Sequence, residues 1–237
     1  MNPLRAIIDL LLPRVCHICG DKLLDDEDFL CTSCLRKLPL TGYERYWTNK
    51  TGPNTDLNPM EQRFAGQLPL DRAYAPYFYT RDSAIASLVH DFKYRGFSKL
   101  AITMGKIGAK TLQATDLFEG IDLLLPVPIH WTKKHRRGYN QSEMIALGIS
   151  EETGIPVGTQ LKARKPHRTQ TSLTSQQRID NTKDVFTVWN PETLEGKRVM
   201  IVDDICTTGA TLLSAGETIA ASTNHNVRIS FFTLGVV

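Results

Sequence analysis

Residues 199–211 read VMIVDDICTTGAT, and this stretch decides the predicted fold. Its first four residues are apolar and typical of a buried strand, and two carboxylates, Asp203 and Asp204, follow at the expected carboxyl end of that strand. A short loop containing threonine and glycine then leads into a predicted helix. Open α/β sheets bind their ligands at the carboxyl ends of the strands, so the stretch predicts a ligand site.

The loop after the two carboxylates has the composition of a phosphate-binding loop. Backbone N–H groups at the start of a helix bind phosphate, and threonine hydroxyls add further donors. Gly209 allows the backbone to come close to a ligand. The neighbouring carboxylates can accept hydrogen bonds from a diol, so the stretch complements a ribose 5-phosphate. The alternative is an ordinary strand-to-helix turn in which the threonines cap the helix.

Strands alternate with helices through the carboxyl-terminal part of the chain, which predicts an α/β fold with a parallel sheet. From Asp82 to Gly96 the apolar residues repeat with the period of a helix, whereas residues 47–70 are rich in turn formers. The further expected helices are 100–112, 140–149 and 211–221, and the expected strands are 74–79, 123–128, 155–161, 185–188, 199–202 and 227–237.

Four of the five cysteines form two C-x-x-C pairs, Cys16 with Cys19 and Cys31 with Cys34, separated by eleven residues. Two such turns direct four thiolates at one centre, which predicts a closed, structural zinc site. The alternatives are two redox dithiols or two disulfides, but an odd number of cysteines fits poorly with a closed disulfide framework. His17 is expected to be a turn residue, because four sulfur ligands suffice. We therefore divide the chain into a zinc-binding module (1–45), a linker or irregular segment (46–80) and an α/β domain (81–237).

Composition excludes several classes of protein. The chain has 237 residues, 41% of them hydrophobic and 22% charged, with a formal net charge of +3. These values exclude a disordered chain, and the charge is too small to predict nucleic-acid binding by itself. No stretch approaches 18 uninterrupted apolar residues, so no membrane span is expected. The apolar residues 4–12 contain Asp9 and lack a signal-peptide cleavage site, which predicts a short helix packed on the body of a cytoplasmic protein.

Along all thirteen positions, residues 199–211 resemble the signature of type I phosphoribosyltransferases, which bind 5-phosphoribosyl-1-pyrophosphate (PRPP). The resemblance implies a type I phosphoribosyltransferase-like parallel sheet flanked by helices. It also implies that Asp203 and Asp204 hold the ribose 2- and 3-hydroxyls, directly or through Mg²⁺. The residues implied for the 5-phosphate are Thr207, Thr208, Gly209, Ala210 and Thr211.

The order of the other motifs indicates one family among the phosphoribosyltransferase-like proteins. The cysteine pairs are followed by residues 88–96 (LVHDFKYRG), 126–128 (PVP) and 136–141 (RRGYNQ). In this order the chain resembles, over nearly its whole length, the ComF family of competence-related, phosphoribosyltransferase-like proteins. Residues 164–178 then occupy the position of the loop that closes over PRPP in transferases.

The loop after the strand at 123–128 takes the place of the pyrophosphate loop of this fold. The resemblance implies that the residues binding pyrophosphate there are Arg136, Arg137 and Gly138. Arginine binds phosphate oxygens in a forked geometry. The alternative is a solvated basic face. Lys93 is either an anion contact or a charge on a helix surface.

Two functional hypotheses follow. In the first, the protein binds PRPP or a nucleotide-like relative with Mg²⁺ and transfers phosphoribose to an acceptor, as a pentosyl-transferring glycosyltransferase. The sequence identifies neither a catalytic base nor an acceptor site. In the second, which the ComF resemblance implies, a non-catalytic protein of DNA uptake or processing keeps the pocket for binding or regulation. Its partners would be single-stranded DNA or DNA-processing proteins.

Overall fold

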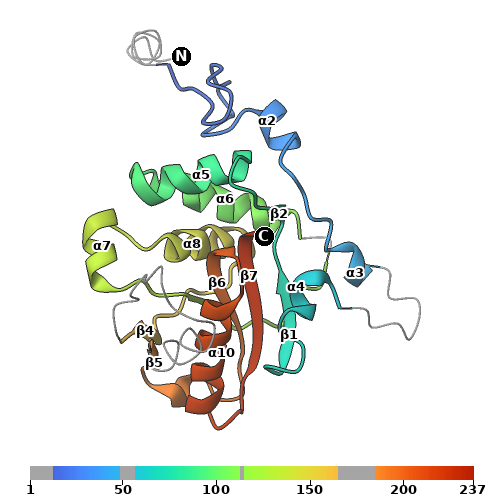
Figure 1. The fold of residues 1–237 in the computed structure, drawn as a ribbon, viewed down its shortest axis with the longest axis vertical. Coiled ribbons are helices and arrows are strands. Elements are labelled where there is room, and N and C mark those ends of the chain that lie inside the picture. Colours follow the sequence, from blue (N-terminus) through green and yellow to red (C-terminus); the bar gives the residue numbers. More distant parts are fainter. Residues whose placement is uncertain (1–12, 49–56, 113–114, 165–184) are drawn as a thin grey trace.

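The computed structural model describes residues 13–48, 57–112, 115–164 and 185–237 (Figure 1). At its centre lies a sheet with the strand order β1–β7–β6–β3, and a short strand, β2, also pairs with β7. All of these pairings are parallel, which confirms the predicted α/β parallel sheet. The strands are β1 (Leu70–Tyr74), β2 (Tyr77–Phe78), β3 (Leu123–Pro126), β6 (Arg198–Cys206) and β7 (Arg228–Val236).

Strands β6 and β7 form the middle of the sheet because both are long and mostly apolar. They pair from Arg198 opposite Arg228 to Cys206 opposite Val236. Near-continuous apolar strands are typical of parallel sheets that are covered on both faces. β6 is longer than the predicted strand 199–202, since it continues through the two carboxylates. Asp203 and Asp204 therefore lie in the last part of a central strand rather than in the loop after it.

Helices cover both faces of the sheet (Figure 1). Successive residues of a strand point to opposite faces. A Cβ at Gly108 would meet Phe232, whereas a Cβ at Gly216 would meet Phe231, so the helices that carry these glycines pack on opposite faces of β7. The helices around the sheet are α5 (Ala84–Tyr94), α6 (Ser98–Lys110), α8 (Gln141–Thr153) and α10 (Ala210–Ser222).

Close packing of α6 against α8 fixes the position of α8 over β6. A Cβ at Gly105 would lie 2.2 Å from the Ile145 carbonyl oxygen, so only glycine permits this approach of the two backbones. At its amino-terminal end, α8 begins at Asn140, whose side chain caps the helix and also donates to the Val127 carbonyl at 3.0 Å. These contacts bring the first turn of α8 to the carboxyl end of β6.

The described part of segment 46–80 departs from the irregular linker that the sequence predicts. It begins within α3 (Arg45–Thr48) and contains α4 (Pro59–Gln62) and the sheet strands β1 and β2. The side chain of Asn58 accepts hydrogen bonds from Met60 N and Glu61 N, and its amide donates to the Ala73 carbonyl at 2.8 Å. Asparagine and proline, which break regular structure elsewhere, here form the N-cap and the first helical position.

Two other elements differ from the predictions. Residues 131–137, expected to be a loop, form α7 (Trp131–Arg137). Of the strand expected at 155–161, Val157 forms an isolated parallel bridge with Leu124 of β3. The strand that follows, β4 (Leu161–Ala163), pairs antiparallel with β5 (Phe186–Val188) in a separate sheet, beside a short 3₁₀ helix, η1 (Pro191–Thr193). The helix predicted at 4–12 and the loop predicted at 164–178, except for Arg164, lie outside the described residues.

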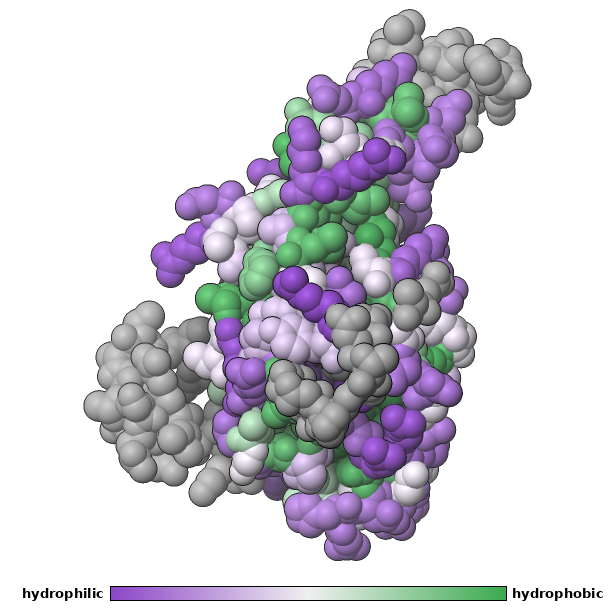
Figure 2. Space-filling view, turned by 90° about the vertical axis from the view of Figure 1, so that its right-hand side faces the viewer, coloured by the Kyte–Doolittle hydropathy of each residue, from purple (hydrophilic) through white to green (hydrophobic). Residues whose placement is uncertain are grey.

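The amino-terminal cysteine module lies at one end of the molecule and contacts the body near α5 and α6 (Figure 1). Its helix is α2 (Thr32–Arg36), and two of its cysteines, Cys16 and Cys34, are buried. The surface shown in Figure 2 carries mainly hydrophilic residues on the module, with apolar patches below it where it meets the body. None of the described helices combines the length and the apolar character that a membrane crossing requires.

Candidate functional site

The acid pair at the end of β6 is held by the first turn of α8. The Ser142 hydroxyl donates to Asp203 Oδ1 at 2.8 Å, and the backbone N–H of Asp204 donates to the same oxygen at 2.9 Å. Burial and, second, the adjacent negative charge of Asp204 together raise the pKa of Asp203 to about 7, against the opposing effect of its hydrogen bonds and of Lys93. The two carboxylates therefore favour a nearby cation or hydrogen-bond donor.

Asp204 has a cationic partner from a distant part of the chain. Lys93, in the last turn of α5, places its Nζ 2.7 Å from Asp204 Oδ2. Both side chains are largely buried, with exposures of 21% for Lys93 and 14% for Asp204. An ion pair in this setting is screened less by salt than one on the open surface.

The predicted 5-phosphate loop follows β6 directly and leads into α10. Gly209 is the N-cap of this helix and has a φ of +82°, so glycine is required there for the backbone to turn. The first backbone N–H groups of a helix have no partner within the helix and can bind an anion. Thr207 and Thr208, together with Ala210, are exposed beside them, and Thr211 is half-buried. The loop thus presents donors to solvent at the same strand end as the acid pair.

Segment 57–80 packs against this loop, and no local sequence pattern predicts this contact. Arg63 donates to the Thr207 carbonyl, and a Cβ at Gly209 would lie only 2.7 Å from the Phe64 ring. Cys206, at the end of β6, is buried, and burial raises the pKa of its thiol to about 11. A thiol in this state is a packing group rather than a nucleophile at neutral pH.

The basic residues predicted to bind pyrophosphate lie in and after α7. Arg137 donates from Nη1 to Gln141 Oε1 at 2.8 Å, and its guanidinium lies 5.2 Å from the centre of the Tyr94 ring. Arg136 is exposed. Gly138 ends α7 with a φ of +81°, and its N–H bonds the Lys134 carbonyl. The N–H of Gly138 is therefore already engaged in capping α7.

A cavity of about 460 Å³ connects these elements. It is lined by Lys93, Tyr94 and Gly96 at the end of α5 and by Arg136 and Arg137 at the end of α7. Three of these five residues are cationic and none is acidic. Since Lys93 also contacts Asp204, the structure brings the predicted pyrophosphate residues to the neighbourhood of the acid pair. The link is Lys93, for which the sequence left two interpretations open.

The donor set at the end of β6 fits a hard divalent cation. Mg²⁺ is bound in proteins by one or two carboxylates together with ligand phosphates and water. Asp203 and Asp204 are adjacent, half-buried carboxylates, and the predicted 5-phosphate loop and a cationic cavity lie beside them. Asp203 and Asp204 would hold Mg²⁺, which would supply positive charge to a bound phosphorylated ligand.

The four cysteines of the module form one cluster. Their sulfur atoms all lie within 4.8 Å of one another, and Cys19 Sγ lies 3.8 Å from Cys31 Sγ. This matches the edge, about 3.8 Å, of a tetrahedron with Zn–S bonds of about 2.3 Å. Burial alone would raise the pKa of the Cys16 thiol, but hydrogen bonds from Cys19, Cys31 and Ile18 lower it to about 6. The cluster therefore fits the structural zinc site that the spacing predicts.

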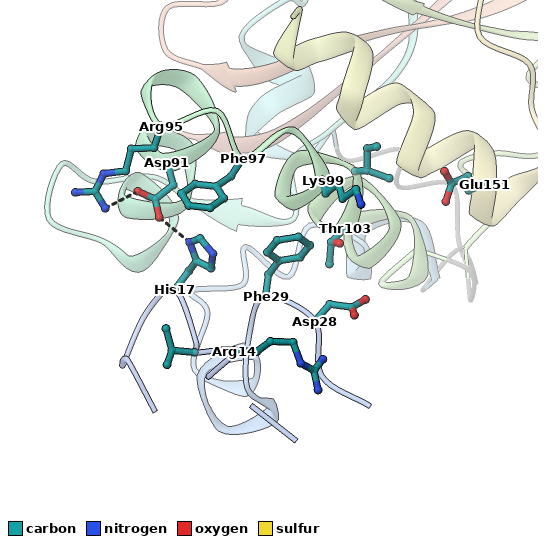
Figure 3. Close-up of a pocket in the computed structure, with 12 residues that line it drawn as sticks. Arg14, His17, Asp28, Phe29, Asp91, Arg95, Phe97, Lys99, Thr103 and Glu151 are labelled. Carbon is teal, nitrogen blue, oxygen red and sulfur yellow. Dashed lines mark hydrogen bonds and ion pairs between the residues drawn. The ribbon is translucent and has the colours of Figure 1, made fainter. Parts of the chain in front are cut away.

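His17 lies outside the cysteine cluster and joins the module to the body. Its Nδ1 lies 2.8 Å from Oδ2 of Asp91, a buried carboxylate of α5, and Asp91 Oδ1 lies 3.2 Å from Arg95 Nη1 (Figure 3). The His17 ring packs edge-on against the Phe97 ring, with 4.6 Å between the two ring centres. Around this contact lies a larger cavity, of about 930 Å³, between the module and α5–α6.

Residues 125–231 match the family described as phosphoribosyl transferase domain, and this range includes β6, the acid pair and α10. Competence protein F of Haemophilus influenzae is 27% identical over 133 residues, which are 54% of this chain and 58% of that protein. DNA utilization protein YhgH of Salmonella typhi is 28% identical over 138 residues, 56% of this chain and 60% of that protein. The chain thus spans less than two thirds of the length of these two relatives.

Competence protein ComFC of Bacillus subtilis is similar over a longer range, with 22% identity over 221 residues, 93% of this chain and 83% of that protein. Among solved structures, the allosteric regulatory enzyme of purine biosynthesis shares 21% identity with a TM-score of 0.40, over 60% of this chain and 29% of that one. A purine phosphoribosyltransferase from Pyrococcus horikoshii shares 16% identity with a TM-score of 0.30, over 56% of this chain and 80% of that one.

Proposed function

Because the chain belongs to the ComF family of phosphoribosyltransferase-like proteins, we propose that it binds PRPP or a related ribose phosphate together with Mg²⁺. The observation that carries the proposal is the end of β6. There, two carboxylates are followed by a glycine-capped helix start, and the lysine that contacts one carboxylate lines a cavity with two arginines.

Each part of this site has a matching part of the ligand. Residues 207–211 offer backbone N–H groups and hydroxyls to the 5-phosphate. Asp203 and Asp204 accept hydrogen bonds from the ribose hydroxyls, directly or through Mg²⁺. Arg136 and Arg137 face the pyrophosphate, for which the forked guanidinium is well suited.

Transfer of phosphoribose is the reaction that such a site supports. The bond between ribose C1 and the pyrophosphate oxygen breaks, its electron pair leaves with the pyrophosphate, and an acceptor forms the new bond to C1. Bound Mg²⁺ would neutralise part of the departing charge. The chain's own contribution is to hold the ribose in line through the acid pair and to stabilise the pyrophosphate through its arginines.

A second candidate is a non-catalytic role in DNA uptake or processing, in which the ribose-phosphate pocket serves binding or regulation. Two observations favour it. The relatives carry the names competence protein and DNA utilization protein. The cavity between the module and α5–α6 also holds the rings of Phe29 and Phe97 and the cations Arg14, Arg95 and Lys99, together with the carboxylates Asp28, Asp91 and Glu151 (Figure 3). Aromatic rings beside cations are typical of single-strand binding surfaces.

The two candidates are separated by calorimetric titration of the zinc-loaded protein with PRPP and Mg²⁺, followed by an assay for pyrophosphate release with candidate acceptor bases. Asp203→Asn combined with Asp204→Asn should weaken PRPP binding tenfold or more per residue, since each loses a charged hydrogen bond worth about 1.5–3 kcal/mol. Asp122→Asn is the matched control, because Asp122 binds the opposite end of β6 through Arg198 N.

Binding with pyrophosphate release supports the transferase. Binding without release, combined with affinity for a fluorescent single-stranded oligonucleotide, supports the second candidate. Unchanged PRPP affinity in the folded double variant would reject this strand end as the site. We also propose a structural zinc at the four cysteines and a cytoplasmic location, because a four-thiolate site requires a compartment that keeps cysteines reduced.

A further inference from the structure

Lys93 connects the acid pair to the cationic cavity. Its Nζ lies 2.7 Å from Asp204 Oδ2, and the same side chain lines the cavity of about 460 Å³ together with Arg136 and Arg137. The ion pair is largely buried, and it joins α5 to β6, which are far apart in the sequence. Of the two sequence interpretations of Lys93, a solvated charge on a helix surface does not describe this position.

The contact places the lysine where a divalent cation would also bind. Asp204 Oδ2 is an oxygen that the proposed function offers to Mg²⁺ or to a ribose hydroxyl. A metal ion bound to that oxygen would be close to the Lys93 ammonium group, and two positive charges at such a distance repel each other. When Lys93 and a metal ion both contact Asp204, each therefore lowers the binding affinity of the other.

The cavity gives the ammonium group a second partner. Lysine has three donor hydrogens, and the contact with Asp204 uses one of them. Tyr94, the next residue of α5, lies against the Arg137 guanidinium at 5.2 Å, so the ends of α5 and α7 form the two walls of one cavity. Arg137 Nε is buried and has no hydrogen-bond partner among the described residues. A pyrophosphate group in this cavity would meet three cationic side chains.

We propose that Lys93 competes with a divalent cation for Asp204, and that binding of a metal–pyrophosphate ligand moves the ammonium group from Asp204 to the phosphates. The inference rests on the proposed function, because it assumes that the ligand places a pyrophosphate beside the acid pair. Lys93 is thereby both the counter-charge of Asp204 in the free protein and a ligand contact in the complex. This role predicts that removing the Lys93 charge strengthens metal binding but weakens PRPP binding.

The first experiment measures metal binding without any nucleotide. Zinc-loaded protein is titrated with Mn²⁺, and free Mn²⁺ is followed by electron paramagnetic resonance. Lys93→Met should bind Mn²⁺ about tenfold more tightly than the unaltered protein, because a charge-assisted hydrogen bond no longer opposes the metal. Lys106→Met, on α6, is the matched control. Lys106 Nζ pairs with Glu151 Oε2 at 2.5 Å, and Lys106 lies outside both the acid pair and the cavity that Lys93 lines. This variant should show no change in Mn²⁺ affinity.

The second experiment measures PRPP affinity by calorimetry at saturating Mg²⁺. Lys93→Met should bind PRPP about tenfold more weakly, whereas AMP, which lacks the pyrophosphate, should bind with nearly the same affinity. Lys93→Arg retains the charge and should stay within threefold of the unaltered protein in both experiments. A purely structural role for Lys93 would instead weaken metal, PRPP and AMP binding together.

The outcomes separate this inference from the proposed function. If the unaltered protein fails to bind PRPP, the proposed function is rejected, and the Mn²⁺ titration still decides whether Lys93 opposes a metal. If PRPP binds but Lys93→Met neither gains Mn²⁺ affinity nor loses PRPP affinity, the inference is overturned. Should Lys93→Met fail to fold, Lys93→Gln removes the charge with a polar side chain and is read in the same way.

Discussion

Replacing Gly209 by alanine tests how the phosphate loop is held. The residue has a φ of +82°, where a non-glycine residue costs about 1–2 kcal/mol. A Cβ there would also lie 2.7 and 2.8 Å from two carbons of the Phe64 ring, and overpacking of this kind costs about 1–3 kcal/mol. Gly209→Ala should therefore lower the free energy of unfolding by about 2–5 kcal/mol, which corresponds to a fall of about 10 °C in Tm.

The chain offers a matched control for the backbone part of this cost. Gly154 ends α8 with a φ of +76°, and a Cβ there would have no neighbour within 4 Å. Gly154→Ala should lose only the conformational cost of about 1–2 kcal/mol. Urea denaturation of the two variants then isolates the contact with Phe64. Phe64 is buried against Phe231, so Phe64→Leu has a cost of its own, but combined with Gly209→Ala it should lose less stability than the sum of the two single changes. Equal losses in the two single variants would refute the argument that segment 57–80 packs against this loop.

Three further outcomes are expected. Freshly purified, reduced protein should contain about one zinc per chain by metal analysis. Cys16→Ser should abolish zinc binding and leave the circular dichroism of the α/β body unchanged. A zinc-free preparation would contradict the proposed role of the cysteine cluster. Arg136→Ala with Arg137→Ala should weaken PRPP binding at least tenfold more than AMP binding in calorimetry, and equal losses would place these residues outside the pyrophosphate site. His17→Ala should increase proteolysis of the module by trypsin, since the contact with Asp91 is lost; an unchanged digestion rate would show that other contacts anchor it.

The elements that could be predicted from the sequence are those specified by neighbouring residues. The apolar run of β6 with its two carboxylates, the helical period before Gly96 and the two C-x-x-C pairs are local patterns, and the structure contains all three elements. The helix α7 is different. Its sequence, WTKKHRR, has no apolar period, and the family resemblance predicts a loop there.

The parts of the site that the sequence does not reveal are contacts between distant residues. Ser142 and Asp203 are 61 positions apart, and Arg63 and Thr207 are 144 apart. A serine at a helix start is common for reasons of capping alone, so nothing local shows that it also binds a carboxylate. The sheet order brings these pairs together, and only the folded chain shows which polar residues share a strand end.

The hydrogen bond between His17 and Asp91 has a consequence for how this protein can be divided into pieces. A chain cut after the cysteine module would retain Asp91, a carboxylate only 4% exposed, but lose the partner that the module supplies. Asp91 also lines the cavity between the module and α5–α6, so the cut would uncover this carboxylate as well as remove its partner. Its remaining neighbours would be Arg95, 3.2 Å from Asp91 Oδ1, and His90, 3.9 Å from the same oxygen, and both of these side chains are largely exposed. Exchange of the module between related chains would therefore have to supply a partner for Asp91 in place of His17, or change Asp91 as well.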